Sequence, residues 1–277
     1  METEVRYHMM RPSQIVARRK ECPIAYIPLG TIEWHGLHNP TGTDGHLAEH
    51  QANRCAQKGG GLAFPPLYYG ESRLNGMMEA KAIDRDKIAE KMELSSENFK
   101  AERMPFSQME QDFNYTRLLI HILAEVESLG FSIGVFVAGH YPLIECAREA
   151  VLFFNRRDYR PDRMLAWAFA DYLLLKDEVK CAGDHAAGWE TSHMLAIHPQ
   201  TVDMSALPPK GSKLIGVGGD EHAKTPWEAD AEFGKEMFEK AADAAIKEAT
   251  HRLNNKELYF RIGFCLKEGL WKKSQPL

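Results

Sequence analysis

The stretch GTIEWHGLHNPTGTD, residues 30–44, decides how this chain is interpreted. It follows PIAYIPLG at residues 23–30, a short apolar run typical of a buried strand. The strand therefore leads directly into a polar segment in which Glu33, His35 and Asp44 lie within twelve residues.

Glu33 and His35 are two residues apart, and side chains two apart along an extended chain point to the same side. The glycines and Pro40 predict a loop that folds Asp44 back towards this pair. Carboxylates together with imidazoles suit Zn²⁺, Mn²⁺ or Fe²⁺ better than Mg²⁺ or Ca²⁺. The alternative is that Asp44 belongs to a turn or caps a helix at residues 46–58.

Strand and helix patterns alternate along the rest of the chain. FSIGVFVA at 131–138 is a continuous apolar run, as in a buried parallel strand. Residues 62–69 fit a strand end or a loop, and 164–175 fit either a helix or a strand. Helices are expected at 46–58, 115–130, 143–155, 190–197 and 227–254. The alternation predicts an α/β sheet with helices on both faces and a site at the carboxyl ends of the strands.

Further polar residues occur where such a site is expected. His140 directly follows the 131–138 strand, Asp184 and His185 lie in a loop of small residues, and Glu190 lies where a helix begins. Each of these residues has a purely structural alternative. His140 could be an ordinary loop residue. Glu190 could stabilise the helix dipole at the start of its helix, with Thr191 or Ser192 as the helix N-cap. Jointly, two metal ions with a bridging carboxylate could be held by Glu33, His35, Asp44, His140 and Glu190.

Composition limits the class of protein. The 277 residues suffice for one large α/β domain or two small ones, and the net charge of −5 argues against nucleic acid as a partner. The five cysteines are scattered, without a C-x-x-C pair, which favours reduced thiols in a cytoplasmic protein. The charged N-terminus does not resemble a signal peptide, and no apolar run predicts a membrane span.

Two regions lack a clear pattern. Residues 71–111 are charged, rich in Met and Ser and without a sustained apolar period, so we expect an excursion that forms a lid or an oligomer arm. Residues 255–277 form a variable tail. We treat residues 1–277 as a single domain.

The motifs together resemble the creatininase (creatinine amidohydrolase) family. The first motif is GxxExHGxHxPxGTD at residues 30–44, and the third is HAxGxETSxML at 185–195. Ala138-Gly139-His140 is similar to a second family motif that is usually Asn-Gly-His, and IGVGGD at 215–220 is similar to a late family segment.

The resemblance implies a three-layer α/β/α sandwich with a mainly parallel sheet, and two divalent ions, zinc or manganese with iron as an alternative. It implies that Asp44 bridges the ions, that His185 moves a proton, and that Asp184 is a neighbouring acidic group. The other metal ligands would be Glu33, His35, His140 and Glu190. Family members commonly form homo-oligomers, and creatininase itself forms hexamers.

Two departures from the family motifs affect the expected activity. Creatininase itself has a glutamate two residues after the second-motif histidine, where this chain has Pro142, and the usual asparagine is Ala138. We therefore expect the metal chemistry to be shared, and creatinine not to be the substrate.

The expected reaction is attack by metal-activated water on a carbonyl of a small polar cyclic substrate, with His185 protonating the leaving group. A creatininase-like amidohydrolase would cleave a C–N bond. One alternative is a C–C hydrolase that opens an oxidised, diketo inositol ring. Another is a non-catalytic family member, for which we would expect eroded ligand positions.

Overall fold

A computed structural model of the chain describes residues 3–73, 82–157 and 162–259. Its centre is a four-stranded sheet in the order β2-β1-β3-β4, in which all paired strands are parallel. The strands are β1 (Ile24–Leu29), β2 (Leu62–Ala63), β3 (Ile133–Ala138) and β4 (Leu165–Phe169).

Both faces of the sheet are buried, which explains why the strands are continuous apolar runs. Alternate side chains of β3 enter two different hydrophobic clusters: Val135 and Val137 face one, and Phe136 and Ala138 face the other. The register pairs Leu29 with Ala138, so β1 and β3 end at the same level. The segments after these two strands therefore emerge side by side.

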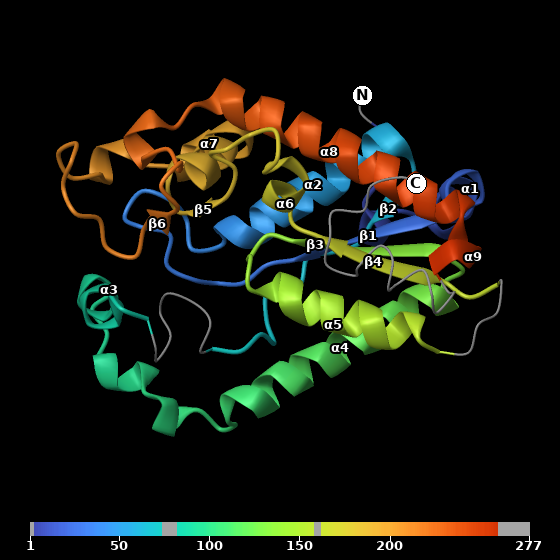
Figure 1. Cartoon of the computed structure of the whole chain (residues 1–277), viewed down its shortest axis with the longest axis horizontal. Coiled ribbons are helices and arrows are strands. Elements are labelled where there is room, and N and C mark those ends of the chain that lie inside the picture. The colour runs from blue at the N-terminus through green and yellow to red at the C-terminus, as the bar shows by residue number, and fades with distance from the viewer. Residues whose placement is uncertain (1–2, 74–81, 158–161, 260–277) are drawn as a thin grey trace.

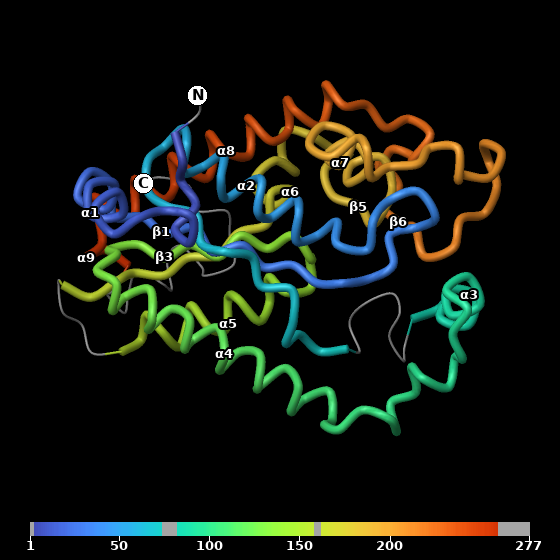
Figure 2. Tube along the Cα trace, turned by 180° about the vertical axis from the view of Figure 1, so that it is seen from behind, coloured from blue at the N-terminus to red at the C-terminus, as the bar shows by residue number. Residues whose placement is uncertain are grey.

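Helices cover both faces of this sheet, as Figure 1 shows. On one side lie α2 (Thr43–Gly59), α6 (Asp171–Leu175), α7 (Gly188–Ile197) and α8 (Ala231–Asn254). On the other lie α4 (Gln108–Ser128) and α5 (Leu143–Asn155), and the reverse view in Figure 2 gives the same division. The prediction of a three-layer α/β fold with a mainly parallel sheet is confirmed.

Shorter elements complete the described residues. The helix α1 (Pro12–Glu21) begins with a proline, a favoured residue at this position, and the sequence analysis missed it. Two residues of β5 (Asp184–His185) pair antiparallel with β6 (Gly218–Gly219). The remaining helices are α3 (Arg85–Lys91), α9 (Lys256–Tyr259) and the 3₁₀ turns Tyr7–Met9, Ser96–Phe99, Ala101–Arg103, Pro199–Thr201, Met204–Ala206 and Pro226–Glu228. No described helix is both long and apolar enough to cross a membrane.

The predicted elements differ from the observed ones mainly at their ends. The ambiguous stretch 164–175 is a strand followed by a helix, β4 and then α6. The helix expected at 115–130 begins at Gln108, because Ser107 and Glu110 form a capping box that the analysis placed inside the excursion. The helix expected at 46–58 begins at Thr43, so Asp44 lies in its first turn and not in a loop.

Residues 82–113, here called the arm, run away from the sheet and carry α3 at their far end (Figures 1 and 2). Six large apolar side chains of the arm are exposed: Ile83, Met92, Leu94, Phe106, Met109 and Phe113. Residues 74–81 of the predicted excursion and 260–277 of the predicted tail lie outside the described residues. The single-domain organisation and the function of 71–111 stay predictions.

Candidate metal centre

The site forms where α2 begins above the carboxyl ends of β1 and β3. A β-carbon at Gly139 would collide with the backbone carbonyl of Asp44, and one at Gly30 would collide with the backbone of Gly45. Glycine at both strand ends therefore lets the first turn of α2 reach the sheet. This close approach brings Asp44 beside His140, which follows Gly139.

Asp44 lies at the centre of the site. Its side chain is buried, its Oδ1 lies 3.0 Å from Nε2 of His35, and its Oδ2 lies 3.1 Å from Nδ1 of His140. No side chain caps the N-terminus of α2, which excludes the capping alternative for Asp44. Each carboxylate oxygen thus faces a different imidazole.

The other two carboxylates lie on opposite sides of Asp44. Oε1 of Glu33 is 2.9 Å from Nδ1 of His140, and Oε2 of Glu190 is 3.4 Å from Nε2 of His35. Both carboxylates are buried. The structure therefore brings together the five predicted ligands, here called the ligand cluster: Glu33, His35, Asp44, His140 and Glu190.

A strained backbone residue holds Glu190. Ala186 has φ of 55°, a left-handed conformation that is unfavourable for a residue with a side chain, and its N–H donates to Oε2 of Glu190 at 2.7 Å. Such strain persists only where surrounding contacts impose it. Glu190 is the third residue of α7, and the side chains of Thr191 and Ser192 lie within the helix, so they do not cap it.

Asp184 caps this helix. Its carboxylate accepts hydrogen bonds from the backbone N–H groups of Ala187, Trp189 and Glu190, at 3.2, 2.6 and 3.2 Å. Burial raises the pKa of Asp184 to about 7, against these three donors. The carboxylate is directed at the backbone of α7, the helix that carries Glu190.

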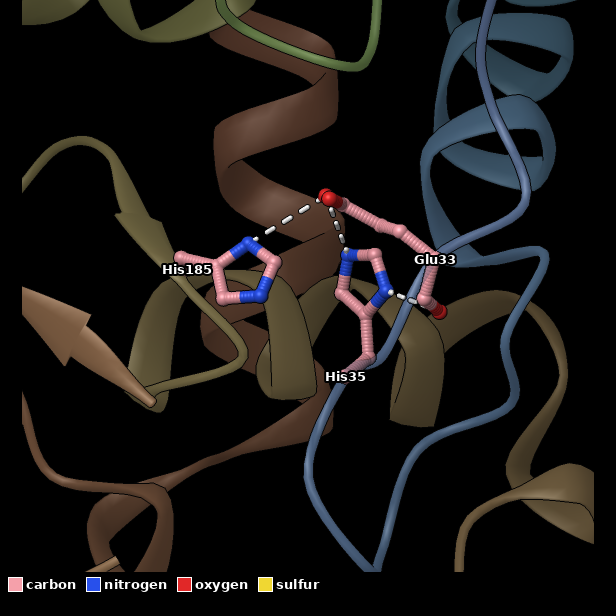
Figure 3. Close-up of side chains that lie close together, drawn as sticks. All are labelled: Glu33, His35 and His185. Atoms are coloured by element: carbon pink, nitrogen blue, oxygen red, sulfur yellow. Dashed lines mark hydrogen bonds and ion pairs between the residues drawn. The ribbon is translucent and has the colours of Figure 1, made fainter. Parts of the chain in front are cut away.

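His185 lies beside Glu33 and His35, as Figure 3 shows. Its Nε2 donates to the backbone carbonyl of Trp34 at 2.8 Å, which leaves Nδ1 unprotonated and facing Oε1 of Glu33 at 3.4 Å. The same oxygen lies 3.8 Å from Nε2 of His35. With 23% of its side chain exposed, His185 is accessible to solvent while the five ligands are not.

The donor atoms form three groups that fit a metal ion. Two of them, Glu33-Asp44-His140 and His35-Asp44-Glu190, share Asp44, and the third is Glu33-His35-His185. Within each group the atoms lie within 4.8 Å of one another. Carboxylate oxygens with imidazole nitrogens are suitable ligands for Zn²⁺, Mn²⁺ and Fe²⁺.

The pKa values indicate that this cluster attracts positive charge. Burial alone would lower the pKa of His35, but Asp44, Glu190 and Glu33 together raise it to about 10. His140 likewise has a pKa well above its usual value, because Glu33 and Asp44 outweigh burial. Protons on imidazoles are one way to balance buried carboxylates, and divalent ions are another.

Thr191 connects the two segments of the site. Its buried hydroxyl accepts a hydrogen bond from Nδ2 of Asn39 at 2.9 Å and lies 3.0 Å from Nε2 of His38. Thr191 directly follows Glu190, whereas His38 and Asn39 belong to the segment that carries Glu33, His35 and Asp44. The sequence analysis did not identify this connection, because it joins residues more than 150 positions apart.

A further acidic residue, Asp171, lies just after β4 and could not be recognised from the sequence patterns. Its carboxylate accepts from the indole N–H of Trp189 at 3.3 Å, and burial raises its pKa to about 6. The rule that polar residues follow buried strands would have found it, had β4 been recognised. His50 and His193 both pack on the ring of Phe238.

Comparisons with known proteins identify the family of the chain. The sequence model of the family described as Creatininase: Creatinine amidohydrolase matches residues 8–84 and 99–249. The sequence is also similar to the 3-dehydro-scyllo-inosose hydrolase of Thermotoga maritima, at 38% identity over 68 residues. That match spans 24% of this chain and 22% of the relative's length.

Solved structures of creatininases share the fold. A creatininase in a manganese form aligns with a TM-score of 0.64 at 20% identity, over 89% of this chain and 99% of the other. A Zn–Zn form of a creatininase variant aligns equally well, with a TM-score of 0.64 at 20% identity and the same coverage of both chains. At this identity the likeness establishes the fold.

Proposed function

Because the chain belongs to the creatinine amidohydrolase family, we propose that this hydrolase works with two divalent metal ions bound by the ligand cluster. One observation carries the proposal: the two oxygens of Asp44 face different imidazoles, at 3.0 and 3.1 Å, and each forms a separate group of three ligands. This is the arrangement that a bridging carboxylate requires.

The metals are proposed to be zinc or manganese, with iron as the alternative. The manganese and Zn–Zn forms of creatininase support this choice, as does the mixture of oxygen and nitrogen donors. When bound, such ions lower the pKa of a water molecule and polarise a carbonyl group. Element analysis of the purified protein tests the proposal: two ions per chain would support it, and a metal-free active protein would reject it.

His185 is proposed to move the proton. The Trp34 carbonyl fixes its Nε2–H tautomer, so Nδ1 can accept a proton from one group and donate it to a leaving group. Burial and the neighbouring His35 lower the pKa of His185, which favours the neutral imidazole before the reaction. Asp184, which holds the following helix, is proposed as a positioning residue.

Replacement of His185 by Asn distinguishes a proton carrier from a metal ligand. We expect turnover to fall about 10²- to 10⁴-fold, the usual contribution of general acid–base catalysis, with the metal content unchanged. Loss of one ion would instead assign His185 to the Glu33-His35-His185 group. Replacement of exposed His121 by Asn serves as the control.

The substrate is proposed to be a small polar cyclic molecule with a carbonyl group. In the first version the enzyme cleaves a C–N bond, as the name of its family describes. In the second it cleaves a C–C bond of a diketo inositol, which the short match to an inosose hydrolase supports. Product analysis after incubation with creatinine, other cyclic amides and keto-inositols separates the two versions.

A non-catalytic role is the remaining alternative. It predicts that ligand positions have been lost, whereas the five predicted ligands are present and lie together. Absence of turnover with all substrate classes, in protein that contains both ions, would favour this alternative.

We further propose that the protein is a cytoplasmic homo-oligomer. The exposed apolar side chains of the arm, including Ile83 at 98% and Met109 at 63% exposure, suit contact with a second copy. The four cysteines within the described residues are free, as in a reducing compartment. Light scattering during size-exclusion chromatography measures the oligomer mass, and a monomer would reject this part of the proposal.

A further inference from the structure

A pocket lies between the arm and residues 207–217, outside the ligand cluster. Its volume is about 220 Å³. A cavity of about 150 Å³ accommodates benzene, so the pocket has room for a compact ligand with one ring and one small polar group. Its apolar lining includes Leu37, Leu207, Leu214, Ile215 and Val217.

Positive charge surrounds this apolar pocket. Lys91 of α3 and Lys213 line it from two different segments. Residues 207–217 contain two lysines and no acidic residue, although the chain as a whole has a net charge of −5. Asp84 is near Lys213, but its carboxylate already accepts from the backbone N–H of Gly216 at 3.1 Å and pairs with Lys87 at 3.2 Å.

A buried polar atom belongs to the same pocket. His38 lines it and is 2% exposed, and its Nδ1 has no hydrogen-bond partner in the described part of the chain. A β-carbon on Gly36 would lie 2.7 Å from this Nδ1 and 3.3 Å from Val217, so the nitrogen is next to two other lining residues. Burial lowers the pKa of His38 to about 4, against the effect of the nearby Ala186 carbonyl, so the ring is neutral.

The neutral ring still carries one N–H. The Nε2 of His38 lies 3.0 Å from the Thr191 hydroxyl, which in turn lies 3.5 Å from the Ala186 carbonyl, so these contacts engage Nε2 and leave Nδ1 without a partner among the described residues. A buried polar atom without a partner is rare in folded proteins and calls for a water or a ligand. An apolar pocket with two ammonium groups and an unpartnered buried ring nitrogen suits a small organic anion.

We propose that this pocket binds a small carboxylate with a compact apolar body, the carboxylate directed at Lys91 and Lys213 and the body at the apolar lining beside His38. The site is separate from the proposed hydrolysis and does not depend on it. It is nevertheless connected to the ligand cluster, because Gly36 directly follows His35, and Gly218, next to Val217, pairs with His185.

Fluorine NMR with 4-fluorobenzoate tests the proposal on the full-length protein. We expect saturable broadening of the probe signal, and binding at least about tenfold weaker for the amine analogue, 4-fluorobenzylamine. Replacement of both Lys91 and Lys213 by Gln should weaken benzoate binding about tenfold or more, which corresponds to about 1.4 kcal/mol. Lys240→Gln, at an exposed lysine of α8, is the matched control.

Two further variants exclude the metal site as the source of the signal. Val217→Phe fills the pocket and should abolish binding, whereas Asp44→Asn, designed to lose the ions, should bind benzoate as the unmodified protein does. The proposal is overturned if benzoate binding survives the double lysine replacement, or if it disappears with Asp44→Asn alone. The second result would make the probe a metal ligand and would leave the proposed hydrolysis intact.

Discussion

In the ligand cluster the carboxylates of Asp44 and Glu190 are only 1% and 2% exposed, whereas in the arm the apolar side chains of Ile83 and Met109 are 98% and 63% exposed. Both regions reverse the usual distribution of residues in a folded protein. The cluster consists of charged groups held away from water. The arm exposes six large apolar side chains to water among its many charged residues.

Each reversal indicates a missing partner of a different kind. Buried carboxylates are unfavourable unless cations or donors balance them, so the cluster requires positive charge. Exposed apolar surface is unfavourable unless another surface covers it, which is the basis for our proposal that the arm contacts a second copy of the chain. We therefore propose different partners for the two regions, ions for the cluster and a second copy for the arm, and each proposal can be tested by removing the side chains on which it rests.

The largest effect is expected from replacing Asp44 by Asn. The amide keeps the shape of the side chain but cannot bridge two cations, so both ions should be lost and turnover should fall about a thousandfold or more. Element analysis and a turnover assay measure the two effects. The control variant Asp86→Asn, at an exposed position of α3, should change neither the metal content nor the turnover. If Asp44→Asn retained two ions, Asp44 could not be the residue that bridges them.

Gly139→Ala tests the backbone frame of the cluster. The added methyl group meets the Asp44 carbonyl, so we expect about 2 to 3 kcal/mol of destabilisation together with weaker metal binding. Urea unfolding of the metal-free protein measures the first effect. The matched control is Gly218→Ala, where a β-carbon meets nothing within 4 Å, and equal losses in the two variants would contradict the account.

Asp171 shows how a buried carboxylate behaves outside the cluster. Burial raises its pKa from 3.8 to about 6, so the folded state holds a proton that the unfolded state releases. Its contribution to stability is therefore complete below about pH 4 and is lost as the pH rises through about 6. At 1.36 kcal/mol per pKa unit, the loss is about 2 to 3 kcal/mol.

Asp171→Asn should remove this pH dependence. Relative to the unmodified protein, the variant should gain about 2 to 3 kcal/mol in free energy of unfolding between pH 4 and pH 7. Urea unfolding of both proteins at several pH values gives this difference, in which the titration of other groups cancels. A difference that stays constant with pH would show that Asp171 has an ordinary pKa.

The smallest effect on stability is expected in the arm. Combined replacement of Phe106, Met109 and Phe113 by Ser should change the free energy of unfolding of the subunit by no more than about 0.5 kcal/mol per site. It should nevertheless reduce the mass seen by light scattering to that of a smaller assembly. Phe153→Ser removes a phenylalanine of α5 that is 52% exposed and should leave the mass unchanged; an arm variant of full mass would contradict the association role.

The sequence was sufficient to predict the frame of the site. The apolar runs that became β1 and β3 are unambiguous, because strands buried on both faces exclude polar residues. Glu33 and His140 were then placed at the same sheet edge by the rule for parallel strands. The pairing of Leu29 with Ala138 bears out that reasoning.

What the sequence could not supply depends on contacts between distant residues. That Asp44 reaches His140 depends on two glycines that permit close approach, and a glycine alone does not reveal what will approach it. The cap that Asp184 provides and the hydroxyl bridge of Thr191 are equally dependent on the fold. The arm was recognised as unusual, but its apolar residues have no period that would predict their exposure.

The most direct test of the central claim is anomalous X-ray diffraction from crystals of the protein, recorded at the zinc and manganese absorption edges. We predict two peaks about 3.5 to 4 Å apart on either side of Asp44. One should be bounded by Glu33 and His140 and the other by His35 and Glu190. A single peak that does not touch Asp44, or no peak in an enzymatically active crystal, would contradict the two-ion account.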